Sequence, residues 1–245
     1  MRFFSKSGAF TSYEMYSITH FILLAACAIL IAAALFLSRH FDKKAVLKTI
    51  LICTALLWIF EATKIIFNLC IGNAKNPNTY IPLYYCSIPL YCGILSSFAK
   101  GKAKRIGDVF LTVGGLSGGI IYLLFPSTTA GMYPAFHFIT IQSFIHHSIM
   151  TYLGFLLIIT NYINLKFSDI SYYSSTVIVF SILAYIVNLF LDTNLMFVSK
   201  DFPGTFISLI YKICPPMFPV LITVIQAFPP FLIIYRIIKK IFYDK

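Results

Sequence analysis

The chain has 245 residues, of which 59% are hydrophobic and only 11% charged, and its mean hydropathy is +0.86. Soluble domains carry about 25% charged residues, so this composition excludes an ordinary soluble protein and predicts an all-α membrane helix bundle. The net charge of +11 does not indicate a nucleic-acid partner, because the basic residues lie between apolar runs, where they set orientation and contact anionic lipid head groups.

Seven apolar segments follow one another along the chain, and each is near the length of about 20 residues that a spanning helix needs. The connections between them are short, so we expect a single integral membrane domain over residues 1–245 in the cell membrane, with several passes. The segments are Ser17–Leu37, Ala45–Leu69, Tyr80–Phe98, Gly107–Phe125, Phe136–Thr160, Tyr172–Leu191 and Met217–Tyr235.

The basic residues predict the orientation of these segments. Thirteen of the 19 Lys and Arg residues lie on one side: in the connections after the first, third and fifth segments, and after the seventh. The positive-inside rule places that side in the cytoplasm, which puts the amino terminus outside and the carboxyl terminus in the cytoplasm.

Two further patterns bear on packing rather than chemistry. In the fourth segment, small residues are spaced so that helix backbones can approach closely; they are Gly114, Gly115, Gly118 and Gly119. The connection 192–217 combines prolines with apolar side chains, which favours a re-entrant or interfacial cap over a solvated loop.

The third segment opens on the stretch Tyr80–Tyr91, which contains two prolines, a cysteine and four tyrosines. Proline frees a backbone carbonyl one turn back, and this is tolerated in a membrane where neighbouring helices or cavity waters replace the bond. The stretch is either a kinked helix with an ordinary buried Cys86 or the wall of a site.

Most polar residues inside the apolar segments fall at one depth, in the half of the bundle that the charge pattern places outside. Cys86 lies about two turns into the third segment, and at 1.5 Å per residue the polar residues of the fifth lie roughly 8–17 Å below its mouth. The set comprises His20, Glu61, Lys64, Cys86, His137, Gln142, His146, His147, Asn188, Asp192 and Asn194.

Several of these residues also have structural interpretations. Glu61 and Lys64 can pair on one helix face, although intramembrane charges usually mark function. His146 and His147 are adjacent and point about 100° apart, so one serves a site and the other packs. The polar residues after the sixth segment can cap its end, and His20 and His137 lie near the interface, where such side chains are tolerated.

Cys86 and a histidine supply the minimum for acyl transfer through a thioester. A desolvated thiol is unreactive without a base beside it, so we expect His147 or His146 close to Cys86. Tyr84, Asn188 or Asn194 could donate hydrogen bonds to the oxyanion. The six cysteines lack metal-site spacing and mostly lie in apolar segments; no metal, cofactor or disulfide framework is expected, with Cys70–Cys214 the one pair that could bridge.

The stretches Pro82–Ile88 and Phe144–Ser148 resemble the bacterial YwaF-like integral membrane proteins. These are similar to an animal transmembrane acyltransferase of ether-phospholipid remodelling and, more distantly, to the androgen-induced membrane hydrolases. The resemblance implies a cysteine nucleophile at Cys86 and a histidine partner at His147, because a small residue, here Ser148, follows the family histidine. Tyr84 departs from the pattern, which has a histidine two residues before the cysteine.

Two functions follow. The first is a lipid acyltransferase or acyl-ester hydrolase acting on a membrane phospholipid, with a lysophospholipid or water as acceptor. The alternative is a proton-coupled small-molecule transporter or binding protein that uses Glu61, Lys64 and the histidines. A purely structural role is third, and the oligomeric state does not follow from the sequence.

Overall fold

The computed structural model describes residues 2–243, and within them every regular element is a helix. Lys245, one of the basic residues used to predict the orientation, lies outside the described residues. The α-helices are α1 (Ile18–Ser38), α2 (Lys43–Cys70), α3 (Ile88–Phe98), α4 (Gly101–Leu124), α5 (Phe138–Ile159), α6 (Ile170–Leu191), α7 (Phe206–Ile213), α8 (Phe218–Ala227) and α9 (Pro229–Ile238). Seven short 3₁₀ or π turns lie between and beside them, among them Pro77–Thr79, Tyr85–Ser87 and Leu195–Phe197.

Six helical stretches are long and apolar enough to cross a membrane. They are α1, α2, α4, α5, α6 with the turn before it, and the stretch Pro215–Ile241 that contains α8 and α9. The last of these is interrupted at Phe228, where Pro229 and Pro230 follow, because proline removes a backbone donor and its ring clashes with the preceding turn. The chain is therefore a multi-pass membrane protein.

The third predicted segment differs from the expectation of a full spanning helix. Its helix begins only at Ile88, after the turn Tyr85–Ser87, and the 14 residues Tyr85–Phe98 are shorter than a span. Residues 81–83 before the turn are not helical, since Pro82 disfavours helical geometry at Ile81, and Tyr84 is extended. Pro89 is tolerated because it sits in the first turn of α3, where its missing N–H would have no partner.

The closest helix packing joins α4 to α5, as the glycines predict. A Cβ at Gly115 would lie 2.7 Å from the carbonyl oxygen of Met150, and one at Gly119 would lie 2.2 Å from Thr151 Oγ1. On the facing helix, a Cβ at Gly154 would lie 3.0 Å from the carbonyl oxygen of Thr112. Because glycine has no side chain, the two backbones are in contact at these positions. This contact fixes the position of α5 along the axis of α4.

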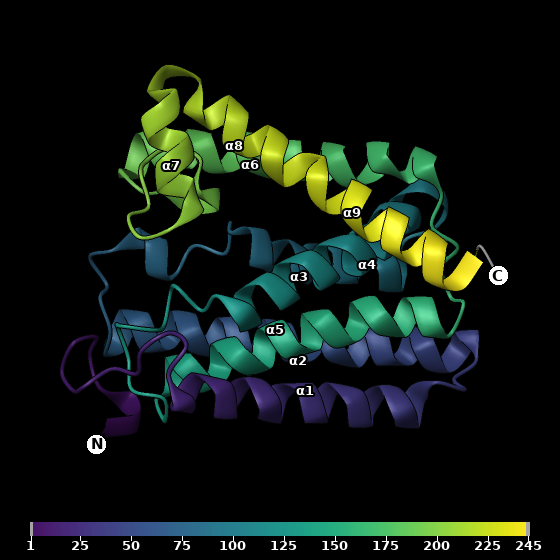
Figure 1. Ribbon diagram of the computed structural model, residues 1–245, viewed down its shortest axis with the longest axis horizontal. Helices are drawn as coiled ribbons and strands as arrows, with labels where there is room; N and C mark the ends of the chain where they lie inside the picture. The colour runs from purple at the N-terminus through teal and green to yellow at the C-terminus, as the bar shows by residue number, and fades with distance from the viewer. Residues whose placement is uncertain (1, 244–245) are drawn as a thin grey trace.

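The helices lie roughly side by side, with α1 at one edge and α6 to α9 at the other (Figure 1). The amino terminus and the connection 192–205 lie at one end of the bundle, and the carboxyl terminus lies at the other with the α1–α2 turn and the α5–α6 connection (Figure 1). All six cysteines are free thiols. The connection after α6 folds into short helical pieces against the bundle, as the cap predicted there would require.

Candidate functional site

Cys86 occupies the first turn of the short helix Tyr85–Phe98 and is half-buried. Its neighbours in sequence hold it in place. The ring of Tyr85 packs beside Gly118, and its hydroxyl lies 2.8 Å from Ser117 Oγ and 2.5 Å from the hydroxyl of Tyr173. The turn Tyr85–Ser87 therefore holds Cys86 at the amino-terminal end of the short helix.

His146 is the imidazole that contacts the Cys86 turn. Its Nε2 lies 3.0 Å from the backbone carbonyl oxygen of Cys86. A carbonyl only accepts, so Nε2 carries the proton and Nδ1 keeps the lone pair. Nδ1 is buried and has no hydrogen-bond partner among the described residues. The structure therefore places a buried basic nitrogen without a described partner on a histidine that contacts the Cys86 turn.

His147 points differently, as expected for adjacent residues on a helix. Its Nδ1 donates to the carbonyl oxygen of Ser143 at 2.7 Å, and its ring stacks on Tyr122 with centroids 3.7 Å apart. It packs toward α4, whereas His146 faces the turn that carries Cys86.

The ion pair of Glu61 and Lys64 lies within reach of the same group. Glu61 is only 2% exposed, and its Oε1 lies 2.7 Å from Lys64 Nζ without hydrogen-bond geometry. The charges of both residues act on the Cys86 thiol and on the His146 imidazole. The two opposite charges act on each of these groups in opposite senses, so their effects on each group partly cancel.

Gln142 joins α5 to this part of α2 from the side. It is buried, and its Nε2 donates to the carbonyl oxygen of Phe60, beside Glu61, at a long 3.5 Å. Its Oε1 accepts from Ser143 Oγ at 3.3 Å. Gln142 thus belongs to the surroundings of the pair and makes no described contact with Cys86.

The other two buried histidines tie helices and the amino-terminal segment together. His20 accepts from the Tyr16 N–H through Nδ1 and donates to the Leu123 carbonyl through Nε2. His137 accepts from the Ile139 N–H and donates to the Ser5 carbonyl, and burial lowers the pKa of its imidazole. Both ring nitrogens of each residue are occupied, so neither has a nitrogen left for proton transfer.

The polar residues predicted near the end of α6 shape the cap of the bundle. Asn188 donates to the Leu195 carbonyl and to Ser199 Oγ, and Asn194 donates through its side chain to the Lys200 carbonyl. Asp192 ends α6 in the left-handed conformation and pairs with Lys200 at the exposed surface. The side-chain amides of Asn188 and Asn194, proposed as oxyanion donors, are thus hydrogen-bonded to the connection itself.

Asn78 is a residue that the sequence analysis missed. Its Oδ1 accepts from the Asn194 N–H at 2.7 Å and from the Tyr84 hydroxyl at 3.2 Å. Tyr84 also packs on Phe197, with ring centroids 5.4 Å apart. Asn78 therefore connects the cap to the residues just before Cys86, and its position beside Pro77 near the entry stretch is the one signal that could have indicated it.

Within the described residues, no three His, Cys, Asp or Glu side chains are placed to hold a metal ion. Two cavities of the described structure lie away from Cys86: one at the end of the bundle that holds the carboxyl terminus, and an apolar one of about 330 Å³ between α1, α4 and α5.

A model of the TMEM164 family matches residues 15–237, which include every helix from α1 to α8 and most of α9. No curated protein and no solved structure gives a significant match. The relations to the YwaF-like proteins and to the androgen-induced hydrolases rest on the sequence motifs alone.

Proposed function

The chain belongs to the TMEM164 family, and within it we propose a membrane-embedded lipid acyltransferase or acyl-ester hydrolase with Cys86 as nucleophile. The contact of 3.0 Å between His146 Nε2 and the Cys86 carbonyl carries this proposal, because it leaves a buried imidazole nitrogen without a partner beside the cysteine turn. The buried ion pair of Glu61 and Lys64 supports it, because ionisable groups inside apolar segments usually mark function.

The reaction divides into two steps. His146 Nδ1 takes the thiol proton while Sγ attacks the ester carbonyl of a phospholipid, and first-turn N–H groups of the Cys86 helix stabilise the oxyanion. The C–O bond breaks, and the lysophospholipid leaves with the proton from the imidazolium. In the second step the hydroxyl of a lysophospholipid, or water, gives its proton to His146 and attacks the thioester, and Sγ leaves and regains the proton.

Activity of purified variants tests this proposal. Cys86→Ala and His146→Gln should each lower acyl release from a phospholipid by about 10²-fold or more, since general base catalysis alone contributes that much. Cys70→Ala is the matched control, because Cys70 is an exposed free thiol and its loss should leave the rate unchanged. Full activity of Cys86→Ala would rule out the nucleophile.

A second comparison separates the two adjacent histidines. We propose His146 as the base, although the family resemblance assigns that role to His147. His147→Gln should then retain more activity than His146→Gln, since His147 contacts Tyr122 and Ser143 rather than the Cys86 turn. The reverse order would return the base to His147.

The site also needs a position in the membrane. We propose that residues 1–245 form one domain in the cell membrane and cross it seven times, with 80–98 as the third crossing and the amino terminus outside. The extended residues before Tyr85 are tolerated at membrane depth because Tyr84 and Tyr85 are held by protein contacts. A phospholipid of the outer leaflet then reaches Cys86 from the side.

The buried ion pair supports a second candidate function. An intramembrane pair with one 2% exposed carboxylate is also typical of proton-coupled transporters. Uptake of a solute into proteoliposomes under a pH gradient, lost in Glu61→Gln while acyl release is absent from the wild type, would favour that function.

A further inference from the structure

A second group of polar side chains lies at the other end of the bundle, away from Cys86. It surrounds a cavity of about 420 Å³ lined by Lys43, Lys44, Leu47, Lys104, Asp108 and Tyr162. These residues come from the start of α2, the start of α4 and the connection after α5. Its three lysines and single carboxylate leave it with a net positive charge.

The carboxylate of this cavity is already neutralised. Asp108 is 8% exposed, and Lys104 Nζ lies 2.9 and 3.0 Å from its two oxygens. Ser96 donates a further hydrogen bond to Oδ1 at 2.5 Å. Lys104 also donates to the Ser96 carbonyl and to the Tyr162 hydroxyl. These contacts neutralise the negative charge of Asp108 and hold Lys104 in place.

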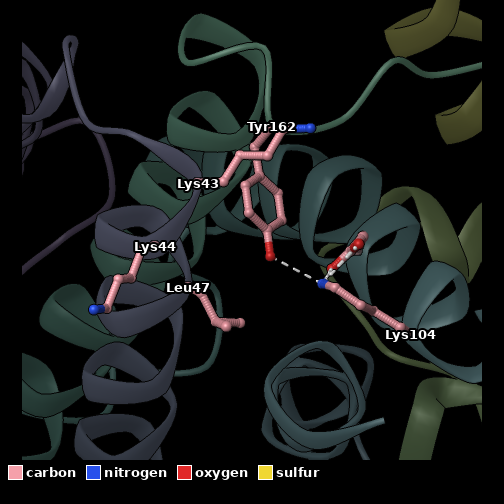
Figure 2. Close-up of a pocket in the computed structure, with 6 residues that line it drawn as sticks. Lys43, Lys44, Leu47, Lys104 and Tyr162 are labelled. Carbon is pink, nitrogen blue, oxygen red and sulfur yellow. Dashed lines mark hydrogen bonds and ion pairs between the residues drawn. The ribbon is translucent and has the colours of Figure 1, made fainter. Parts of the chain in front are cut away.

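The remaining polar groups of the cavity are hydrogen-bond donors. The Tyr162 oxygen accepts from Lys104 Nζ at 2.9 Å, and within the described residues its own proton has no acceptor. Figure 2 shows this hydroxyl pointing into the space between the helix that carries Lys44 and Leu47 and the one that carries Lys104. Lys43 and Lys44 are exposed, and neither has an ion-pair or hydrogen-bond partner in the described part of the chain. Such a lining suits a group that only accepts hydrogen bonds and carries negative charge.

The position of the cavity selects a lipid as its occupant. It lies where the spanning helices α2 and α4 begin, which is the depth of the lipid head groups. Leu47 forms its apolar wall, and Leu51, one turn farther into the membrane on the same face of α2, is 40% exposed. A head group in the cavity would therefore have its acyl chains directed along a lipid-facing surface.

We propose that this cavity binds the phosphate group of an anionic phospholipid, with Lys43, Lys44 and the Tyr162 hydroxyl as ligands. Basic pockets between membrane helices are suited to such head groups. The site is separate from Cys86, so it holds whether or not the chain transfers acyl groups, and it does not depend on the proposed orientation.

Native mass spectrometry of the purified full chain with equal amounts of phosphatidylglycerol and phosphatidylcholine tests the proposal. The wild type should retain one phosphatidylglycerol in preference to phosphatidylcholine. Lys43→Gln/Lys44→Gln should weaken this binding by roughly tenfold or more, since each lysine near an anionic head group contributes about a fivefold factor. Tyr162→Phe should weaken it by about fivefold, the worth of one net hydrogen bond.

Two control variants make the result specific. Lys100→Gln/Lys102→Gln removes the same charge at the same end of the bundle but outside the cavity, and Tyr172→Phe removes a tyrosine hydroxyl near the start of α6. Both should bind within twofold of the wild type. Equal losses in the control and cavity variants would show general attraction to a basic surface and overturn the proposal.

A soluble competitor distinguishes the source of the phosphate. Millimolar glycerol phosphate should leave the bound phosphatidylglycerol in place. Displacement of the lipid by glycerol phosphate would assign the cavity to a soluble phosphate compound and overturn the lipid assignment, as would equal retention of the two lipids by the wild type. Thermal unfolding of each variant in detergent confirms that it is folded.

Discussion

At the scale of single residues, the buried ion pair is the most costly feature of the candidate site. Glu61 is 2% exposed, whereas the side chain of Lys64 is 21% exposed and can reach toward the membrane surface. Removing one partner of a buried pair leaves the other charge without compensation. Ionisable side chains inside apolar segments are rare and usually mark function.

A double-mutant cycle on this pair makes the cost measurable. Glu61→Gln should destabilise the protein by up to about 3 kcal/mol, the low end for a buried pair, because Lys64 is partly exposed. Glu61→Gln/Lys64→Met should be more stable than Glu61→Gln, since no uncompensated charge remains. Unfolding in detergent followed by circular dichroism gives both values, and additive losses would contradict a coupled pair.

Individual residues also show how far sequence reasoning reaches into the site. Glu61, Cys86 and His146 could be singled out because a charge, a thiol or an imidazole is unusual in an apolar segment. Their grouping followed from depth alone, at 1.5 Å per residue. Tyr122 and Asn78 could not be found this way, since their roles depend on which helices pack together and how a loop folds.

At the scale of elements, the entry to α3 shows why a hydropathy pattern overestimated one helix. Residues 80–98 are mostly apolar, so composition alone indicates a span, but helix formation also depends on backbone donors. Pro82 disfavours helical backbone geometry at Ile81, and Tyr84 is extended with φ −92° and ψ 163°. The 3₁₀ turn begins at Tyr85 and α3 follows from Ile88, which places Cys86 at a helix end rather than in its interior.

The contact of α4 with α5 gives a prediction at the same scale. Gly119→Ala places a methyl group against Thr151 Oγ1 and 2.8 Å from the His147 carbonyl oxygen, so the helices must separate. We expect a loss of about 1–3 kcal/mol, the usual cost of overpacking, together with lower activity because α5 also carries His146. Thermal unfolding and acyl release measure the two effects.

A lipid-facing substitution is the control for Gly119→Ala. Ala33→Val adds carbon atoms on the exposed face of α1 and should change stability by less than about 0.5 kcal/mol. If Gly119→Ala is as stable and as active as Ala33→Val, the close approach of the two helices does not position the site.

At the scale of the whole molecule, the sequence predicted the helical class because apolar runs of about twenty residues have few other uses. Short connections alternate between the two ends of the bundle, so the sequence also predicted that the two termini lie at opposite ends. Figure 1 shows them there. The break at Phe228 and the start of α3 were not predicted, because hydropathy averages over prolines that act on single turns.

Labelling of intact cells tests the proposed orientation. In variants that retain only one cysteine, Cys70 should react with a membrane-impermeant maleimide added outside, since it is exposed at the end of α2 that the proposal places outside. A cysteine introduced by Ser168→Cys, exposed in the α5–α6 connection, should react only after permeabilisation. The opposite labelling pattern would show that the molecule has the inverted orientation, with Cys86 toward the cytoplasm.

The central claim is that the Cys86 thiol carries an acyl group during turnover. Purified protein is incubated with a phospholipid that bears an isotope-labelled acyl chain, quenched in acid, digested and analysed by peptide mass spectrometry. We predict a labelled acyl group on the Cys86 peptide that neutral hydroxylamine removes, as it does a thioester. A labelled lipid product formed while the Cys86 peptide stays unmodified, with the same rate in Cys86→Ala, would contradict the account.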